Sequence, residues 1–498
     1  MEESKLATAV NSKVGAPPTE TLTWKSINWK SHRETVRRLQ ERIAKATQLG
    51  KFNKVKVLQR LLTKSFSAMV LAVKRVTENK GRHTPGVDKV IWKTPKQKMT
   101  AVEDLMKRGQ YKASPLRRIH IPKKNGNLRP LGIPTKKDRA VQAIHLMALD
   151  PIAETLADKN SYGFRPKRSI HDAIQACFIA LSQKNSAQWI LEGDIKACFD
   201  KISHDWLLKN VIIDKNVLKA WLKAGFIEDN TLHDTEEGCP QGGLASPCLA
   251  NLALDGLERT ILAIGKQKDK IHFVRYADDW IVTASSREIL EEKVLPIVII
   301  FLKERGLELS TEKTKITHIN AGFDFLGFNI RKYGTKLLIK PGEKGIKTFL
   351  EKVKETIDNM RGNTARNLIF KLNPVIQGWA NHNKHVVSKQ IFSKVDHLIF
   401  QKIWAWAKRR HPNKGITWIR NKYYKKIGNR NWVFFSPRNK KDKKNEDITL
   451  KNASGTRIVR HVKIRAEANP YDTKFSEYFK ARYWNNRMMR SRAAQKRS

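Results

Sequence analysis

Residues 273–282 read Phe-Val-Arg-Tyr-Ala-Asp-Asp-Trp-Ile-Val, which places two adjacent carboxylates, Asp278 and Asp279, inside an apolar and β-branched run. Side chains alternate faces along a strand, so neighbouring aspartates can converge on one point only where the strand turns back. The flanking residues favour strand, which predicts a tight hairpin with the acids at its tip. Taken alone, such a pair most often marks an ordinary solvated turn, so the significance of these acids depends on the rest of the chain.

A third acid follows another predicted strand. Residues 189–193 read Trp-Ile-Leu-Glu-Gly and predict a buried strand, which Asp194 closes. A carboxylate there is costly unless a cation or a hydrogen-bond donor meets it. If the two strands are neighbours in one sheet, Asp194, Asp278 and Asp279 surround a gap suited to Mg²⁺. Two such ions about 3.5–4 Å apart serve in-line phosphoryl displacement, so this arrangement favours nucleotidyl transfer.

The composition points to a polyanionic partner. The 498 residues include 97 Lys and Arg against 47 Asp and Glu, a formal charge of +50, which favours nucleic acid as the partner. The longest apolar run, 294–302, is too short to cross a bilayer, and the N-terminus lacks the pattern of a secretory signal. We therefore expect an intracellular, cytoplasmic protein without a membrane partner. The four cysteines contain no C-x-x-C pair and predict core thiols rather than a zinc or disulfide framework.

The first part of the chain predicts a disordered lead followed by helices. Residues 1–22 mix Gly, Pro, Thr and charges without periodicity. From Trp24 to Lys80, apolar residues recur at helical spacing among many Lys and Arg, and Gly50 marks a break between two amphipathic helices. These helices could equally cap a core or contact nucleic acid.

Residues 116–134 alternate as a hairpin with its turn at Asn125-Gly126. Lys and Arg near a hairpin tip are usually just solvated. A tip that grips a triphosphate would need the same residues, with Arg129 offering a planar fork and Lys123 a point charge. Further on, the paired glycines of 238–247 (Gly-Cys-Pro-Gln-Gly-Gly-Leu-Ala-Ser-Pro) allow close approach of the backbone to a ligand or template, and a helix is predicted over 249–264.

The order of these blocks resembles the reverse transcriptases encoded by bacterial group II introns. The resemblance covers about residues 79–330 and rests on the blocks NKGRHTPGVD, IPKKNGNLRPLGIP, NSYGFRP, DIKACFD, CPQGG, YADD, LSTEKTK and GFDFLGF. It implies an α/β (α+β) right-hand polymerase. The implied organisation is a disordered lead (1–22), a helical N-terminal extension (23–78), fingers and palm (79–335), an α-helical thumb/maturase domain (336–440) and a basic DNA-binding region (441–498).

The same resemblance implies roles for individual residues. Two Mg²⁺ ions would be held by Asp194, the carbonyl of Ile195 and Asp278, with Asp279 beside them. The deoxynucleoside triphosphate would be bound by Lys123, Arg129 and Gln241, and Phe199 would be the aromatic gate that excludes a 2′-hydroxyl.

Downstream, residues 372–381 and 403–412 resemble the intron maturase region, which serves as thumb and as binder of intron RNA. Its helices carry Trp and Ile on one side, so Trp379 and Trp404 are expected in the thumb core rather than stacked on bases. The opposite sides are expected to contact phosphates through Lys408, Arg409, Arg410, Lys422, Lys425 and Lys426. The basic C-terminal stretch, including 468–471 and 478–479, resembles a DNA-binding region, although a loose solvated tail would have the same composition.

The resulting hypothesis is an RNA-directed DNA polymerase and maturase. It would bind its group II intron RNA, assist splicing, and copy the intron into target DNA by target-primed retrotransposition (retrohoming). Many relatives continue into an HNH nuclease, and we expect this protein to lack one. Two alternatives remain open: a maturase that only binds RNA, and a free-standing reverse transcriptase with another role, such as phage defence. The sequence does not predict the oligomeric state.

Overall fold

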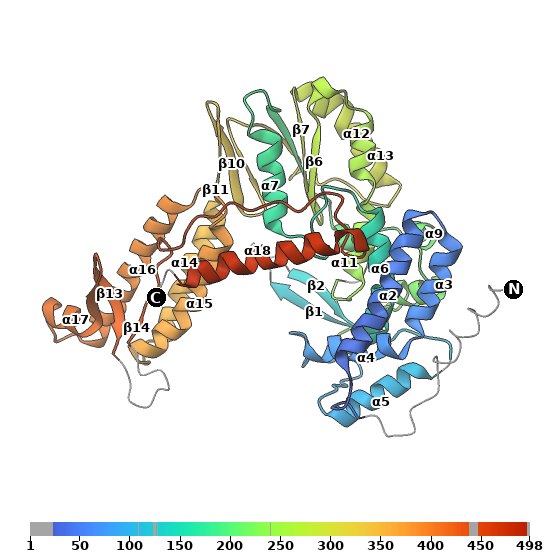
Figure 1. Cartoon of the computed structure of the whole chain (residues 1–498), viewed down its shortest axis with the longest axis horizontal. Coiled ribbons are helices and arrows are strands. Elements are labelled where there is room, and N and C mark those ends of the chain that lie inside the picture. Colours follow the sequence, from blue (N-terminus) through green and yellow to red (C-terminus); the bar gives the residue numbers. More distant parts are fainter. Residues whose placement is uncertain are drawn as a thin grey trace.

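The computed structural model describes residues 23–107, 109–122, 126, 128–239, 241–437 and 447–495. The predicted disordered lead, Lys123 and the Asn125 position of the predicted turn lie outside these residues. In Figure 1 a central sheet with its helices stands above the strands β1 (Leu116–Pro122) and β2 (Leu128–Ile133). One helical group lies on either side, and the helix α18 (Ser476–Gln495) crosses between them.

The N-terminal extension is helical, as predicted, but it contains more helices than the apolar spacing indicates. Gly50, with φ +66°, separates α2 from α3, and the hydroxyl of Ser65 caps an additional helix, α4. These helices share one apolar core with α6, which belongs to the next part of the chain. The elements are α2 (Trp29–Gln48), α3 (Phe52–Thr63), α4 (Phe66–Glu78), α5 (Pro95–Met106) and α6 (Lys136–Leu156).

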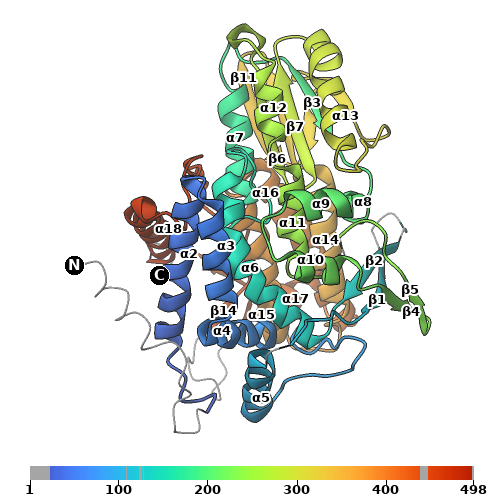
Figure 2. The same ribbon diagram turned by 90° about the vertical axis from the view of Figure 1, so that its right-hand side faces the viewer.

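The predicted hairpin at 116–134 is confirmed. Its strands β1 (Leu116–Pro122) and β2 (Leu128–Ile133) pair antiparallel from Arg117↔Ile133 to Pro122↔Leu128. Two short strands, β4 (Phe226–Glu228) and β5 (Thr231–His233), extend this sheet in the order β2-β1-β4-β5. Figure 2 shows that the hairpin projects on the side away from α2 and α18.

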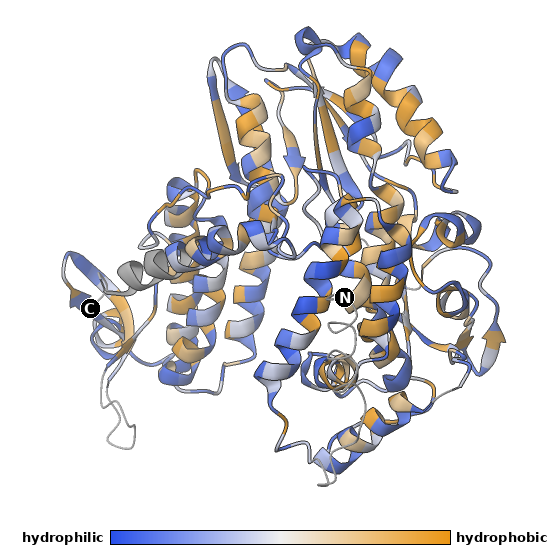
Figure 3. Cartoon of the chain, turned by 45° about the vertical axis from the view of Figure 1, so that its right-hand side comes forward, coloured by the Kyte–Doolittle hydropathy of each residue, from blue (hydrophilic) through white to orange (hydrophobic). Residues whose placement is uncertain are grey.

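The central sheet holds the predicted acidic strands. Its order is β6-β7-β3-β8, made of β6 (His272–Tyr276), β7 (Asp279–Ala284), β3 (Trp189–Gly193) and β8 (Lys315–His318). Alternate residues face opposite layers: Ile190 packs in one core with α7 (Ile170–Leu181), whereas Leu191 packs in another with α11 to α13. Figure 3 shows these strands and their helices rich in hydrophobic residues.

The helix predicted over 249–264 is interrupted. Gly256 adopts φ +102°, which divides it into α11 (Ser246–Leu254) and α12 (Leu257–Ala263), and α13 (Leu295–Lys303) packs beside α12. All four cysteines are buried free thiols, as predicted.

The region predicted as the thumb forms a helical bundle with its own apolar core, reached through a small sheet. The GFDFLGF block forms the antiparallel pair β9 (Phe323–Phe325) and β10 (Phe328–Tyr333), which β11 (Lys336–Pro341) joins. The bundle consists of α14 (Glu343–Asp358), α15 (Ala365–Asn383) and α16 (Lys389–Arg410). Trp379 stacks on Phe349 with ring centroids 4.4 Å apart, and Trp404 packs against Phe400, so both tryptophans lie in the thumb core as predicted.

The region beyond α16 differs from the expected all-helical thumb. After α17 (Ile416–Tyr423) the chain forms a distal sheet of β12 (Tyr424–Ile427), β13 (Arg430–Ser436) and β14 (Ile448–Thr449), and Phe434 of β13 joins the thumb core. The chain then returns across the palm as an extended segment, residues 453–475, here called the strap. It leads into α18 (Ser476–Gln495). Within the described residues, no helix is long and apolar enough to span a bilayer.

Candidate active site

The two adjacent aspartates lie at the predicted hairpin tip. The last pair of the β6–β7 ladder is Tyr276↔Asp279, so Ala277 and Asp278 form the two-residue turn, with Ala277 at φ +59°. The neighbouring ladder pairs Gly193 with Trp280, which places Asp194 beside the start of β7. The sheet therefore brings together all three acids that the sequence analysis selected.

Two glycines make this close approach possible. A Cβ on Gly193 would lie 2.0 Å from the Trp280 ring, and a Cβ on Gly163 would lie 2.3 Å from the backbone nitrogen of Ala277. No real side chain tolerates such distances, so both positions require glycine. Gly163 belongs to the NSYGFRP block, which therefore supports the hairpin tip from outside the sheet.

Lys313 is a site residue that the sequence analysis did not assign. Its Nζ donates to Asp194 Oδ2 at 2.7 Å, and the Asp194 side chain is 19% exposed. The backbone holds this approach, because Ser310 N donates to the Asp194 carbonyl and Lys196 N donates to the Glu308 carbonyl. These two hydrogen bonds form an antiparallel bridge between Ile195 and Leu309, and in this bridge the Ile195 carbonyl points away from residues 308–310. The LSTEKTK block contains Lys313, but spacing alone could not show which of its two lysines meets an acid.

The acids repel one another. Although the Asp279 side chain is exposed, desolvation by the surrounding protein and the charges of Asp278 and Asp194 raise its pKa to about 6, while Lys313 opposes that rise. Burial and Asp194 also raise the pKa of Asp278 above its ordinary value, and Arg129 on β2 and Lys313 act in the opposite direction. The site therefore carries excess negative charge that further cations would neutralise.

The donor set suits Mg²⁺, but the metal cluster expected from the sequence is not preformed. Carboxylate oxygens are the ligands that Mg²⁺ prefers, and the mutual repulsion of Asp278 and Asp279 favours binding of a divalent cation. Across the described parts of the chain, however, no three His, Cys, Asp or Glu side chains are grouped so that they could hold a metal ion. Asp194 is instead paired with Lys313. The assignment of Asp194 and Asp278 as metal ligands stays a prediction.

The raised pKa of Asp279 predicts a pH-dependent stability effect in metal-free protein. A folded-state pKa of about 6, against about 3.9 in the unfolded chain, means that stability falls as the pH rises through this window. In EDTA, Asp279→Asn should therefore raise the thermal unfolding temperature at pH 7.5, and the gain should shrink as the pH approaches 4. Differential scanning calorimetry of this variant beside Glu351→Gln, an exposed thumb acid, measures the effect. A gain that is independent of pH would contradict the assignment.

Two of the predicted nucleotide-binding residues, Phe199 and Gln241, lie in neighbouring segments. Ala197, at φ +46°, turns the chain after β3 into the short helix α8 (Cys198–Lys201), where Phe199 packs edge-to-face on Phe164 with centroids 6.2 Å apart. The Phe199 carbonyl accepts a hydrogen bond from Cys239 N at 2.6 Å. Gln241 follows shortly and reaches Asp200 at 3.5 Å. The predicted sugar and nucleotide contacts therefore lie in neighbouring segments, whereas Lys123 lies outside the described residues.

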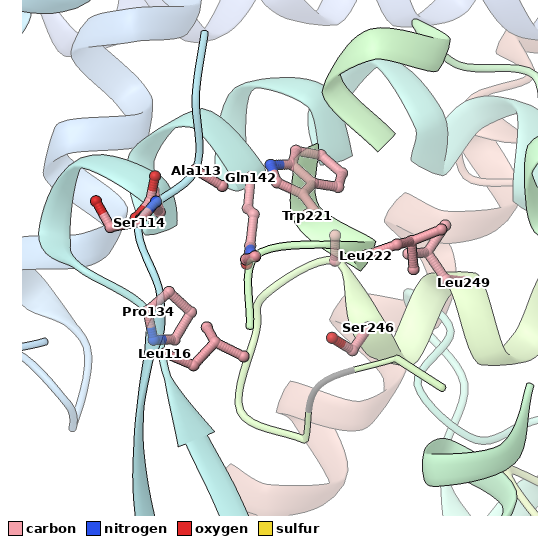
Figure 4. Close-up of a pocket in the computed structure, with 12 residues that line it drawn as sticks. Ala113, Ser114, Leu116, Pro134, Gln142, Trp221, Leu222, Ser246 and Leu249 are labelled. Atoms are coloured by element: carbon pink, nitrogen blue, oxygen red, sulfur yellow. Dashed lines mark hydrogen bonds between the residues drawn. The ribbon is translucent and has the colours of Figure 1, made fainter. Parts of the chain in front are cut away.

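The 241–245 loop is also attached to β2 and α6. The Gln241 carbonyl accepts from Gly132 N of β2 at 2.7 Å, and Gln142 of α6 accepts from Leu244 N at 2.7 Å. Behind the loop lies an enclosed cavity of about 20 Å³, lined by mainly apolar side chains with Gln142, Trp221 and Ser246 among them (Figure 4). This volume accommodates about one water molecule, so the cavity is a packing defect at the fingers–palm junction and not a substrate site.

The predicted phosphate contacts of the thumb lie at the far end of the molecule. Lys408, Arg409, Lys422 and Lys426 are exposed. The other two are partly engaged within the protein, since Arg410 donates to the Asn363 carbonyl at 2.7 Å and Lys425 pairs with Asp447 at 2.6 Å. Two exposed tryptophans that the sequence analysis did not single out lie among these cations: Lys422 lies 4.5 Å from the Trp418 ring centre and Arg420 lies 5.1 Å from that of Trp432.

Three family descriptions match consecutive parts of this chain. "N-terminal domain of reverse transcriptase" matches residues 24–105, "Reverse transcriptase (RNA-dependent DNA polymerase)" matches 121–330, and "Group II intron, maturase-specific domain" matches 346–424. The second match contains Asp194, Asp278 and Asp279. The third ends where the distal sheet begins.

Similar proteins support the same family. Protein YkfC of Escherichia coli is 36% identical over 342 residues, covering 58% of this chain and 88% of that protein. The group II intron-encoded protein LtrA of Lactococcus lactis subsp. cremoris is 30% identical over 329 residues, covering 52% of this chain and 54% of LtrA. This chain thus spans most of YkfC and about half of LtrA. It belongs to the family of group II intron-encoded reverse transcriptases that carry a maturase domain.

Proposed function

We propose that this protein copies its own group II intron RNA into DNA at a target site and assists the splicing of that RNA. The observation that carries the proposal is the meeting of Asp194 with the Asp278-Asp279 hairpin inside the region matched as a reverse transcriptase, in a chain whose thumb matches the maturase domain. Its partners would be intron RNA, target DNA and deoxynucleoside triphosphates, so we place it inside the cell.

The acids would act as a binding site for two Mg²⁺ ions. When bound, Mg²⁺ supplies Lewis-acid activation of the primer hydroxyl and neutralises charge on the leaving pyrophosphate. Asp194 and Asp278 would provide the fixed ligands, and Lys313 would release Asp194 and stay close enough to pair with phosphate. Arg129 of β2, which lowers the pKa of Asp278 by its charge, would bind the triphosphate.

Phe199 would select the sugar by steric exclusion. Phe199→Val should therefore increase incorporation of ribonucleotides relative to deoxynucleotides by about 10- to 100-fold, which corresponds to a clash of about 1–3 kcal/mol. The ratio of kcat/KM for ribo- and deoxynucleotides on one template gives the answer. Phe164→Ala is the matched control, because it removes the ring that packs on Phe199 and leaves Phe199 itself in place. Unchanged selectivity in Phe199→Val would mean that another residue is the gate.

The distal thumb would contribute to RNA binding through two kinds of contact. The exposed lysines and arginines suit phosphates, and the faces of Trp418 and Trp432 suit unpaired bases. Acids are absent from residues 397–441, so the local charge is uniformly favourable for RNA.

Sequencing the RNA that copurifies with the protein from its natural host tests the proposed function. A single highly structured intron, recovered in about one-to-one ratio and spliced faster with the protein than without it, is the expected result. Recovery of RNA without intron sequence would favour a free-standing reverse transcriptase instead.

A further inference from the structure

Arg275 is a buried charge that the proposed chemistry does not use. It lies on β6, two residues before the turn, and its side chain is 0% exposed. Burying a guanidinium is costly unless its hydrogen bonds are satisfied. An Arg inside the apolar run 273–282 was therefore a visible anomaly in the sequence, although no spacing rule assigns it a partner.

The guanidinium connects the acidic turn to α11. Its Nη1 donates to the Ala277 carbonyl at 3.3 Å and to Asn251 Oδ1 at 3.2 Å, and its Nη2 donates to Asp255. Asn251 lies on α11 and Asp255 follows the end of that helix. The Ala277 carbonyl precedes Asp278 by one peptide bond, so the position of this carbonyl sets the direction in which Asp278 leaves the turn.

The other side of the turn is held by the same network. Asn251 Nδ2 donates to the Gly163 carbonyl at 2.9 Å, and Gly163 lies against Ala277 N. The main chain of Arg275 is fixed as well, because its N–H donates to the Asn160 carbonyl and its carbonyl accepts from Tyr162 N. One residue thus ties β6, the 160–163 segment and α11 to the turn.

Stability alone does not account for this arrangement. A buried ion pair contributes little net stability compared with apolar residues of similar volume. The turn, in contrast, requires a restraint: Ala277 adopts a left-handed conformation that L-residues disfavour, and Asp278 and Asp279 repel each other and Asp194.

We propose that Arg275, braced by Asp255 and Asn251, is a positioning residue that holds the Ala277-Asp278 turn so that the Asp278 carboxylate stays beside Asp194. This inference rests on the proposed function for its consequence, which is binding of divalent metal by the two acids. Arg275 touches neither metal nor substrate and acts through the turn.

The experiment compares Arg275→Met with Arg165→Met. Arg165 is a matched control because it is also buried in the palm and forms a 2.8 Å ion pair with Glu154. Among the described hydrogen bonds its side chain donates to Glu154, Asp158 and Ser161, and to none of residues 276–279. Binding of Mn²⁺ to each protein, followed by loss of the free-ion electron paramagnetic resonance signal, is the primary readout. The kcat and the KM for deoxynucleotide are measured in parallel, together with thermal unfolding.

Arg275→Met should weaken Mn²⁺ binding and lower kcat by about 10- to 100-fold, the usual effect of losing a residue that orients a metal ligand, with KM changed little. Arg275→Lys should restore part of the binding, because it keeps the charge but not the fork. Arg165→Met should lose thermal stability and still bind Mn²⁺ as the wild type does. Asn251→Ala gives the same test if Arg275→Met does not fold, because Asn251 holds the same turn through the Gly163 carbonyl.

Wild-type Mn²⁺ affinity in a folded Arg275→Met or Asn251→Ala protein would overturn the inference. Equal losses in Arg165→Met would also overturn it, since they would show a general effect of disturbing the palm. A wild type that binds Mn²⁺ but copies no RNA would refute the proposed function and leave the role of Arg275 standing.

Discussion

The Asp278→Asn variant is expected to lose DNA synthesis on an RNA template by about 10³-fold or more, while its affinity for intron RNA stays within about twofold. Asp278 lies in the two-residue turn of the β6–β7 hairpin, where Asp194 and Asp279 are its neighbours. Removing the charge of Asp278 weakens transition-state stabilisation at the active site alone. RNA affinity, in contrast, is distributed over many phosphate contacts in a protein of net charge +50.

Primer extension and filter binding on the same preparations measure both quantities. Asp234→Asn, which removes an exposed acid after β5, should retain both activities. Substantial extension by Asp278→Asn would show that the hairpin acids do not carry the chemistry. Parallel loss of RNA binding would show that the substitution disturbs the fold instead.

Truncation after Gly455 should destabilise the whole protein, because the strap is packed into it. The buried strap residues Ile464, Ala468 and Phe475 join the core of the palm. Asp172 of α7 is buried and accepts from His461, from Ile464 N and from Arg482, all of which the truncation removes. A buried carboxylate that loses its partners costs about 3–5 kcal/mol, and exposure of the apolar residues adds to this loss.

The strap also forms hydrogen bonds with both helical groups, the one that contains α15 and the one that contains α2 and α6. Val459 N donates to the Lys384 carbonyl in the thumb, Asn469 donates to Thr155 at the end of α6, and Arg37 of α2 donates to the Pro470 carbonyl. Residues 468–471 of the predicted DNA-binding region are buried, and the binding of DNA by this region stays a prediction.

Thermal unfolding of the truncated protein should show a loss of at least about 5 kcal/mol, together with exposure of the palm to limited proteolysis. Lys474→Ala is the control, because Lys474 is exposed and pairs only with Asp472 of the same segment among the described ion pairs. Unchanged stability with a selective loss of DNA affinity would restore the view of this region as a dedicated DNA-binding tail.

The sequence predicted the parts of the fold whose signal is local. Continuous apolar and β-branched runs identified β3, β6 and β7, and the adjacent aspartates marked the hairpin tip, because each pattern lies within about ten residues. The adjacency of Asp194 and Asp278 followed as soon as both strands were assigned to one sheet. The resemblance to a family added the residues expected around the nucleotide, and their roles stay predictions.

The contacts that escaped prediction depend on distant partners. Lys313 meets Asp194 across 119 residues, and Asp172 accepts from Arg482 across 310 residues. Contacts between residues so far apart in the chain produce no periodic pattern in the sequence. The distal sheet was missed because β12 has only four residues, two of them lysines, and because β12 and β13 each bury only one or two residues. Basic composition was therefore interpreted as helix or tail.

The most direct test of metal binding by Asp194 and Asp278 is a structure of the protein with an RNA–DNA template–primer, an incoming deoxynucleotide and Ca²⁺. Ca²⁺ binds the same oxygen ligands without supporting the reaction. We expect cation density between Asp194 and Asp278, contacts from both carboxylates, and Lys313 Nζ moved away from Asp194. Cation density elsewhere, with the 2.7 Å ion pair between Lys313 and Asp194 intact, would contradict it.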